Sequence, residues 1–128
     1  ANLNFITIYI MKQILIVTFF FLLADLQVAN AATMSEMKFN QYSYDTLEIS
    51  KSIRKDLEVA NENKDIEGIM QQVCKLYLIN KEILKTSEKN REYINARINI
   101  TYAKSTLKML SNTSAFNNDS FNLKRDCR

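Results

Sequence analysis

Two cysteines, Cys74 and Cys127, carry the clearest chemistry in this sequence, because they are its only thiols and so have one possible intramolecular pairing. A disulfide between them would close a loop of just over fifty residues, which chain entropy values at about 4 kcal/mol of stability. The alternative is a reactive thiol, but no histidine is present to activate Cys74. We therefore expect a structural disulfide.

The lack of histidine removes the usual proton shuttle near neutral pH, the Ser/His and Cys/His nucleophilic pairs and the imidazole metal ligands. One glycine cannot form a glycine-rich phosphate loop. Acidic residues at helical spacing lie among lysines, with no apolar stretch that would raise the pKa of a carboxyl group. We expect solvated helix faces there, no catalysis, no cofactor and no metal site. These acidic residues are Asp65, Glu67, Glu88 and Glu92.

Three tyrosines are candidate interface residues, since aromatic side chains often anchor protein interfaces: Tyr42, Tyr44 and Tyr102. The alternative is that they are core tyrosines with their hydroxyl groups at the rim. Lys124 and Arg125 form a basic cluster near the C-terminus that could meet an anionic surface or an acidic partner. The same cluster could equally be a solvated chain end.

The elements that position these residues are expected to be helices, because the 128 residues include one glycine and no proline, and 47% of them are hydrophobic. The formal net charge is +3, and basic and acidic residues are interleaved. This pattern argues against a nucleic-acid partner.

The first quarter of the chain resembles an export signal. Met11 and Lys12 form a short positive start, residues 14–24 carry no charge, and residues 29–31 read Ala-Asn-Ala. These are the parts of a cleavable signal peptide, which we predict at residues 11–31. The protein is then exported, to the periplasm or as a secreted protein.

Residues 1–10 precede the candidate start and are interpreted as an upstream or misannotated segment. A rival interpretation is an uncleaved membrane anchor over residues 5–24, which have about the length that a bilayer requires. Lys12 and Gln13 interrupt that stretch near its middle. We expect contact with a membrane only if the signal is not cleaved.

Apolar residues at intervals of three and four predict amphipathic helices in the remaining chain. The first helix is expected to begin between Ser35 and Asn40 and to end near residues 61–64. Another starts after Asn90 and ends before residues 111–114. Their inward faces carry Phe39, Tyr42, Ile49, Ile53, Leu57 and Ala60 in the first, and Tyr93, Ala96, Ile100, Ala103, Leu107 and Leu110 in the other.

The helix between these two is predicted to have Asn63 as its N-cap, with Asp65 and Glu67 in the first turn, where the helix dipole favours anions. It is expected to end at residues 86–90. Gly68 costs this helix about 1 kcal/mol relative to alanine. It could allow a close approach to a neighbour or simply be tolerated.

The predicted fold is an all-α, small antiparallel bundle of about three helices over residues 32–110. A polar, irregular C-terminal tail over residues 111–128 is held to the bundle by the disulfide. The expected function is protein–protein interaction in the cell envelope or outside the cell, as an inhibitor, immunity-type protein, adaptor or chaperone. The partner would be another envelope or secreted protein. The alternatives are a carrier of an apolar ligand within the bundle, or a signal-anchored membrane protein with a helical outer domain.

Overall fold

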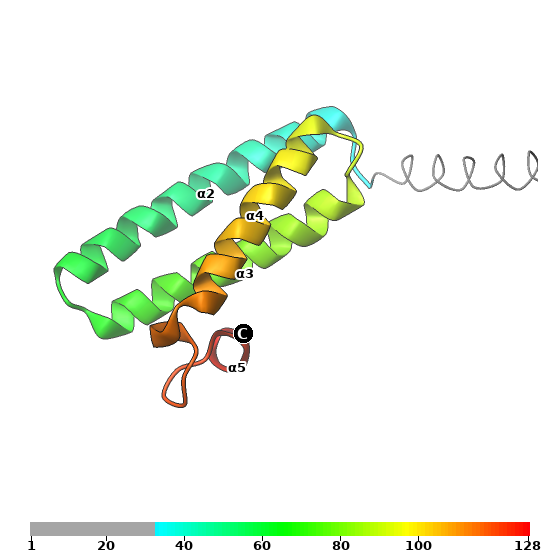
Figure 1. The fold of residues 1–128 in the computed structure, drawn as a ribbon. Coiled ribbons are helices and arrows are strands. Elements are labelled where there is room, and N and C mark those ends of the chain that lie inside the picture. Colours follow the sequence, from blue (N-terminus) through cyan, green and yellow to red (C-terminus); the bar gives the residue numbers. More distant parts are fainter. Residues whose placement is uncertain (1–32) are drawn as a thin grey trace, which may run out of the picture. The chain divides into compact units, whose positions relative to one another are not determined.

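Three long helices account for most of residues 33–128, the part of the chain that the computed structural model describes (Figure 1). They are α2 (Glu36–Glu62), α3 (Ile66–Lys89) and α4 (Ile94–Asn112). Consecutive helices are antiparallel, and α3 packs against both others, whereas α2 and α4 touch each other far less. The predicted all-α antiparallel bundle is confirmed. The predictions for residues 1–10 and for the signal peptide at 11–31 lie outside the described residues.

Helix α2 begins where the sequence predicts, because the Ser35 hydroxyl accepts a hydrogen bond from the backbone N–H of Lys38 at 3.3 Å. The prediction that Asn63 caps the next helix is wrong. The Asn63 N–H still bonds the Val59 carbonyl of α2 at 3.1 Å, and the turn follows at Lys64, whose φ is 54°. Asp65 is the N-cap of α3.

The Asp65 carboxylate caps α3 by accepting a hydrogen bond from the Gly68 N–H at 3.0 Å. A Cβ atom at position 68 would collide with this carboxylate and would lie 3.3 Å from the Cβ of Ala60. Because Gly68 has no side chain, the Asp65 carboxylate can occupy this space and cap α3.

The C-terminal tail contributes to the hydrophobic core instead of lying outside it. After α4 the chain forms a 3₁₀ turn, η1 (Ser114–Phe116), and a one-turn helix, α5 (Leu123–Asp126). Leu123 is 1% exposed, and it packs with core residues of all three long helices. That cluster comprises Ile53, Val73, Leu76, Tyr77, Leu110, Phe121, Leu123 and Cys127.

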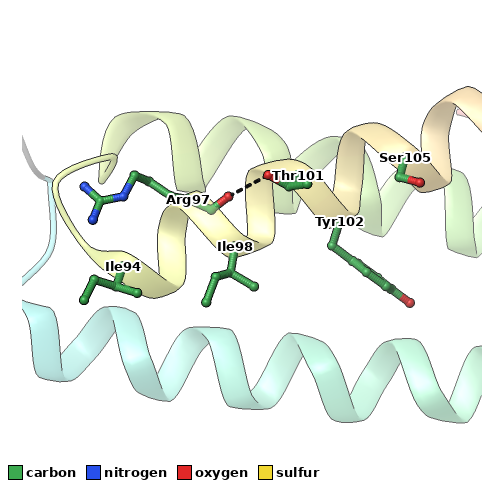
Figure 2. A pocket seen from close by; sticks show the side chains of 6 residues that line it. All are labelled: Ile94, Arg97, Ile98, Thr101, Tyr102 and Ser105. Carbon is green, nitrogen blue, oxygen red and sulfur yellow. Dashed lines mark hydrogen bonds between the residues drawn. The ribbon is translucent and has the colours of Figure 1, made fainter.

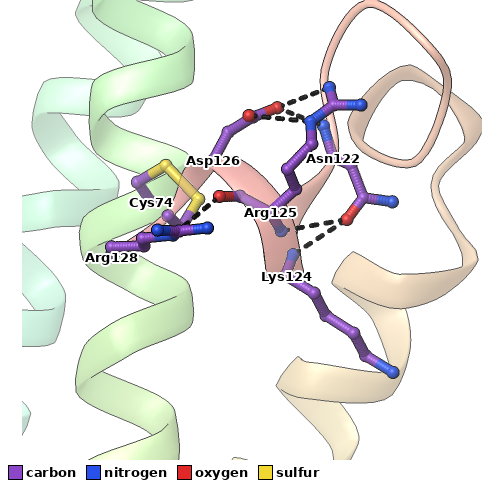
Figure 3. The surroundings of a disulfide bond; sticks show 7 residues. Cys74, Asn122, Lys124, Arg125, Asp126 and Arg128 are labelled. Atoms are coloured by element: carbon purple, nitrogen blue, oxygen red, sulfur yellow. Dashed lines mark hydrogen bonds and ion pairs between the residues drawn. A yellow bond between two sulfur atoms is a disulfide. The ribbon is translucent and has the colours of Figure 1, made fainter.

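The predicted disulfide between Cys74 and Cys127 is confirmed, with a separation of 5.0 Å between the two Cα atoms (Figure 3). It joins α3 to the residue that follows α5. A disulfide of this kind persists in an oxidising environment.

Asparagine side chains order the polar tail. The Asn117 amide donates to the carbonyl groups of Leu110, Ser111 and Thr113 at 2.8–3.0 Å, which satisfies the end of α4. The side-chain oxygen of Asn118 accepts a hydrogen bond from the backbone N–H of Phe121 at 3.1 Å. Asn117 and Asn118, which are typical loop residues by sequence, therefore hold the tail in place through their side chains.

Helix α5 is held by Asp126, whose carboxylate accepts hydrogen bonds from the Arg125 guanidinium at 2.8 and 2.9 Å and from the Asn122 N–H at 2.8 Å (Figure 3). The Arg125 guanidinium, and then the Asn122 N–H, lower the pKa of Asp126 from 3.8 to about 2. The depressed pKa means that this stabilisation is complete above pH 3.8 and is lost as the pH falls toward 2.

An NMR titration of the Asp126 carboxyl group should therefore give a midpoint near pH 2. In Arg125→Ala the midpoint should rise toward 3.8, because the largest cause of the shift is removed. A wild-type midpoint already at 3.8 would contradict the ion pair.

The segment ahead of α2 is fastened to the turn between α3 and α4 by Asn90, which is fully buried. Its side-chain oxygen accepts from the backbone N–H groups of Thr33 at 3.1 Å and Met34 at 3.0 Å, and its amide donates to the Thr86 carbonyl at 2.8 Å. The Tyr93 hydroxyl donates to the Met34 carbonyl at 2.6 Å.

Replacing Asn90 with leucine should lower the free energy of unfolding by roughly 2 kcal/mol, because the N–H groups of Thr33 and Met34 lose their acceptor. Urea unfolding monitored by circular dichroism measures this. The control is Gln71→Leu, an exposed amide on α3, which should change stability by at most about 0.5 kcal/mol. Equal stabilities of the two variants would refute the proposed role of Asn90.

Candidate functional site

Two of the three tyrosines singled out from the sequence are exposed on the surface. Tyr44 on α2 is 61% exposed, and Tyr102 on α4 is 44% exposed. Tyr42 is half-buried on the side of α2 that faces α3, where burial, and to a lesser degree the charge of Glu82, raise the pKa of its phenol. Its ring packs against Phe39, with the ring centroids 5.8 Å apart.

Helix α4 carries a second apolar row that does not face the core. Ile94, Ile98 and Tyr102 recur at four-residue intervals, so they share one face of the helix, and all three are exposed. Figure 2 shows them projecting toward the side on which α2 runs. They border a surface hollow of about 590 Å³, here called the upper hollow. Its lining residues are Ile94, Arg97, Ile98, Thr101, Tyr102 and Ser105.

Hydrogen bonds hold α2 alongside this part of α4. The Asn95 amide donates to the Asn40 side-chain oxygen at 2.7 Å, and the Asn99 amide donates to the Ser43 hydroxyl at 2.8 Å. Tyr44 lies four residues after Asn40 and therefore on the same flank of α2. Tyr102 lines the upper hollow, and Tyr44 does not.

A second hollow, of about 400 Å³, lies further along α2 and is called the lower hollow. Its apolar walls come from three different elements: Leu57 of α2, Ile69 of α3 and Phe116 of η1. Polar residues complete the lining. These are Arg54, Glu58 and Asn61.

Arg54 links the two hollows. It lines the lower hollow, and its Cζ atom lies 5.4 Å from the ring centroid of Tyr102, which lines the upper one. This distance is within the range of a cation–π contact. We call the two hollows, together with the Arg54–Tyr102 contact between them, the α2–α4 groove.

The charged residues that line the α2–α4 groove are two arginines and one glutamate: Arg54, Arg97 and Glu58. Residues 93–118, which include all of α4, contain no aspartate or glutamate but carry Arg97, Lys104 and Lys108. Glu58 is the one acidic side chain among the lining residues of the two hollows. Within residues 33–128, Arg54 forms no salt bridge, and its Nε atom is buried without a hydrogen-bond partner.

Lys124 and Arg125, the other interface candidates from the sequence, lie on α5 beside the disulfide (Figure 3). Neither lines the α2–α4 groove. Arg125 is engaged by Asp126, and it also donates to the backbone carbonyl of Asp119 at 3.2 Å. The structure therefore gives this arginine a role in ordering the tail.

A further hollow, of about 500 Å³, lies on the α2–α3 side of the bundle and offers a rival surface. Ile49 and Leu78 line it, with charges of both signs from Asp56, Lys75 and Glu82. Acidic residues outnumber basic ones in this lining, whereas the lining of the α2–α4 groove has two arginines and one glutamate.

Sequence reasoning missed the groove residues Ile98, Arg54 and Phe116. The four-residue spacing of Ile94, Ile98 and Tyr102 could have indicated a second apolar face. The inward apolar row of the same helix is longer, so it determined the predicted orientation of the helix. The meeting of Arg54 with Tyr102 depends on tertiary packing, for which the sequence offers no local signal.

Neither a metal site nor a membrane span was found in the described part of the chain. No group of three or more His, Cys, Asp and Glu side chains among residues 33–128 could hold a metal ion. No helix in this region is long and apolar enough to cross a bilayer. No protein-family model matches the chain, and comparisons with curated proteins and with solved structures found no match either.

Proposed function

We propose that this protein is exported and acts without catalysis, by binding a helical segment of another envelope or secreted protein in the α2–α4 groove. The observation that carries the proposal is the exposed row of Ile94, Ile98 and Tyr102, which lies beside Arg54, a residue that also lines the lower hollow. Exposed apolar side chains gathered on one helix face are typical of interaction sites. Inhibitor, immunity-type, adaptor and chaperone roles all need only such a surface.

The shape of the α2–α4 groove suits a helix as the bound element. Helix-in-groove recognition places apolar side chains of the partner at three- and four-residue intervals into successive hollows. Tyrosine and arginine are the residue types that dominate binding energy at interfaces, and Tyr102 and Arg54 meet at the middle of this groove.

Export is supported by the Cys74–Cys127 disulfide, which suits an oxidising compartment, and by the signal-peptide pattern of residues 11–31. A mature protein of this kind would meet its partner outside the cytoplasm.

Site-specific photo-crosslinking in the native host tests the proposal. A benzophenone amino acid at position 102 should yield a covalent adduct with one particular protein. The same amino acid at position 85, an exposed lysine on α3 away from the α2–α4 groove, should not yield it. Absence of an adduct at position 102, or the same adduct from both positions, would contradict the proposed binding face.

A further inference from the structure

We propose that the partner segment carries a carboxylate that binds the guanidinium of Arg54, between two apolar side chains seated in the upper and lower hollows. This inference rests on the proposed function and names the chemistry of its partner. The occupant is therefore an acidic amphipathic helix of another protein.

The surroundings of Arg54 leave its hydrogen-bonding capacity unused. The residue is half-buried, its Nε atom has no partner, and no carboxylate within residues 33–128 forms a salt bridge with it. The Nε atom is enclosed by the protein, so an incoming acceptor would meet the terminal Nη atoms of the guanidinium, which form no hydrogen bond to another residue of the described chain. The Nη atoms of Arg54 are therefore the donors that are free to bind an acceptor from outside the described chain.

The Tyr102 ring holds the guanidinium without consuming its donors. A guanidinium can stack on an aromatic ring and still donate through its edge, because all its N–H bonds lie in its own plane. The 5.4 Å approach of the Arg54 Cζ atom to the ring restricts where that edge can point. A carboxylate is the acceptor that matches the planar donor fork, since it can take two parallel hydrogen bonds.

The surrounding charges favour an acidic partner and locate its carboxylate. Arg97 lines the upper hollow, and no acidic residue occurs between Tyr93 and Asn118. Glu58 lines the lower hollow and would repel a carboxylate placed there. The attractive position is therefore at Arg54, between the two hollows.

An anionic membrane is a poorer match for this surface. Exposed carboxylates of α2, among them Glu48, Glu58 and Glu62, would meet a broad negative surface such as an anionic bilayer. A single carboxylate placed at Arg54 does not require contact with them. The lower hollow is built from three elements and accepts single side chains, whereas a lipid surface is read by a continuous helix face.

The test begins with a displayed library of helix-forming peptides, from which binders of the disulfide-bonded protein are selected. Each binder is then synthesised together with a variant in which its acidic residue is replaced by the amide, Glu→Gln or Asp→Asn. Selected peptides should carry an acidic residue between apolar positions. Its amide variant should bind wild-type protein about 10-fold more weakly, as loss of a charge-assisted hydrogen bond predicts. Against Arg54→Met the acid and the amide should bind equally.

Lys55→Met is the matched control, because it removes an exposed cation from the neighbouring position of α2 that lines neither hollow. It should preserve the difference between acid and amide. Unfolding midpoints of both variants are measured alongside, and Arg54→Gln repeats the comparison if Arg54→Met is unstable.

The outcomes separate the two proposals. Peptides that compete with crosslinking at Tyr102 but show no coupling to Arg54 would overturn this inference and leave the α2–α4 groove as the binding site. Selection of peptides that bind only elsewhere would overturn the proposed function as well. Binding to vesicles of phosphatidylglycerol and phosphatidylcholine that is lost in Arg54→Met would replace the protein partner by a membrane.

Discussion

A variant with Cys74→Ala and Cys127→Ala is expected to unfold with a free energy about 4 kcal/mol lower than that of the wild type. The bond closes a loop across 53 residues, and its removal releases that loop in the unfolded chain. Small domains have marginal stability, so this is a large part of the total. The loss is measured by urea unfolding of the purified variant.

Reduction of the wild-type protein is the control for this prediction, since it breaks the same bond without changing the sequence. Reduced wild type and the double variant should have similar unfolding midpoints. The core contacts of Phe121 and Leu123 should also loosen, because Cys127 lies within six residues of both and shares their core cluster. An alanine double variant as stable as the oxidised protein would show that packing alone holds the tail.

The combined replacement Ile98→Ala and Tyr102→Ala should weaken binding of the crosslinked partner by about 100-fold, as expected when two central interface side chains are truncated. Both side chains are exposed, so the free energy of unfolding should change little. Isothermal titration calorimetry measures the affinity, and urea unfolding measures the stability.

Ile66→Ala is the matched control for Ile98→Ala, because Ile66 is 62% exposed and Ile98 is 59% exposed. Ile66 lies at the start of α3 and lines neither the upper nor the lower hollow. Its truncation should leave the affinity unchanged. Equal losses from the two isoleucine variants would mean that binding does not depend on the α2–α4 groove.

The fold could be predicted from the sequence because its determinants are local. Apolar spacing defines each helix, and two cysteines allow one disulfide. The error at the start of α3 arose at Lys64, whose left-handed backbone delays the helix until Asp65. A positive φ at a lysine has no signature in the sequence.

The burial of Asn90 could not be predicted from the sequence either. Asn90 looks like part of a polar turn, yet it is fully buried because the backbone of Thr33 and Met34 needs an acceptor there. Its partners are distant in the sequence, so periodicity cannot reveal the contact.

The sequence predicted only part of the candidate site. Tyr44 and Tyr102 were identified by residue type, but the distinction between them and Tyr42 depends on which flank of α2 meets α3. Arg54 gave no signal, since an arginine among alternating charges is typical of a solvated helix face. Its contact with Tyr102 follows from the packing of α2 beside α4.

Isoleucine methyl NMR tests the binding face most directly, because the chain carries isoleucines on both sides of the bundle. On addition of the crosslinked partner, the methyl signals of Ile69, Ile94 and Ile98 should shift, since these residues line the α2–α4 groove. The signals of Ile49 and Ile79, which line the hollow on the α2–α3 side, should stay in place. Shifts at Ile49 and Ile79 with unchanged Ile94 and Ile98 would contradict the proposed site.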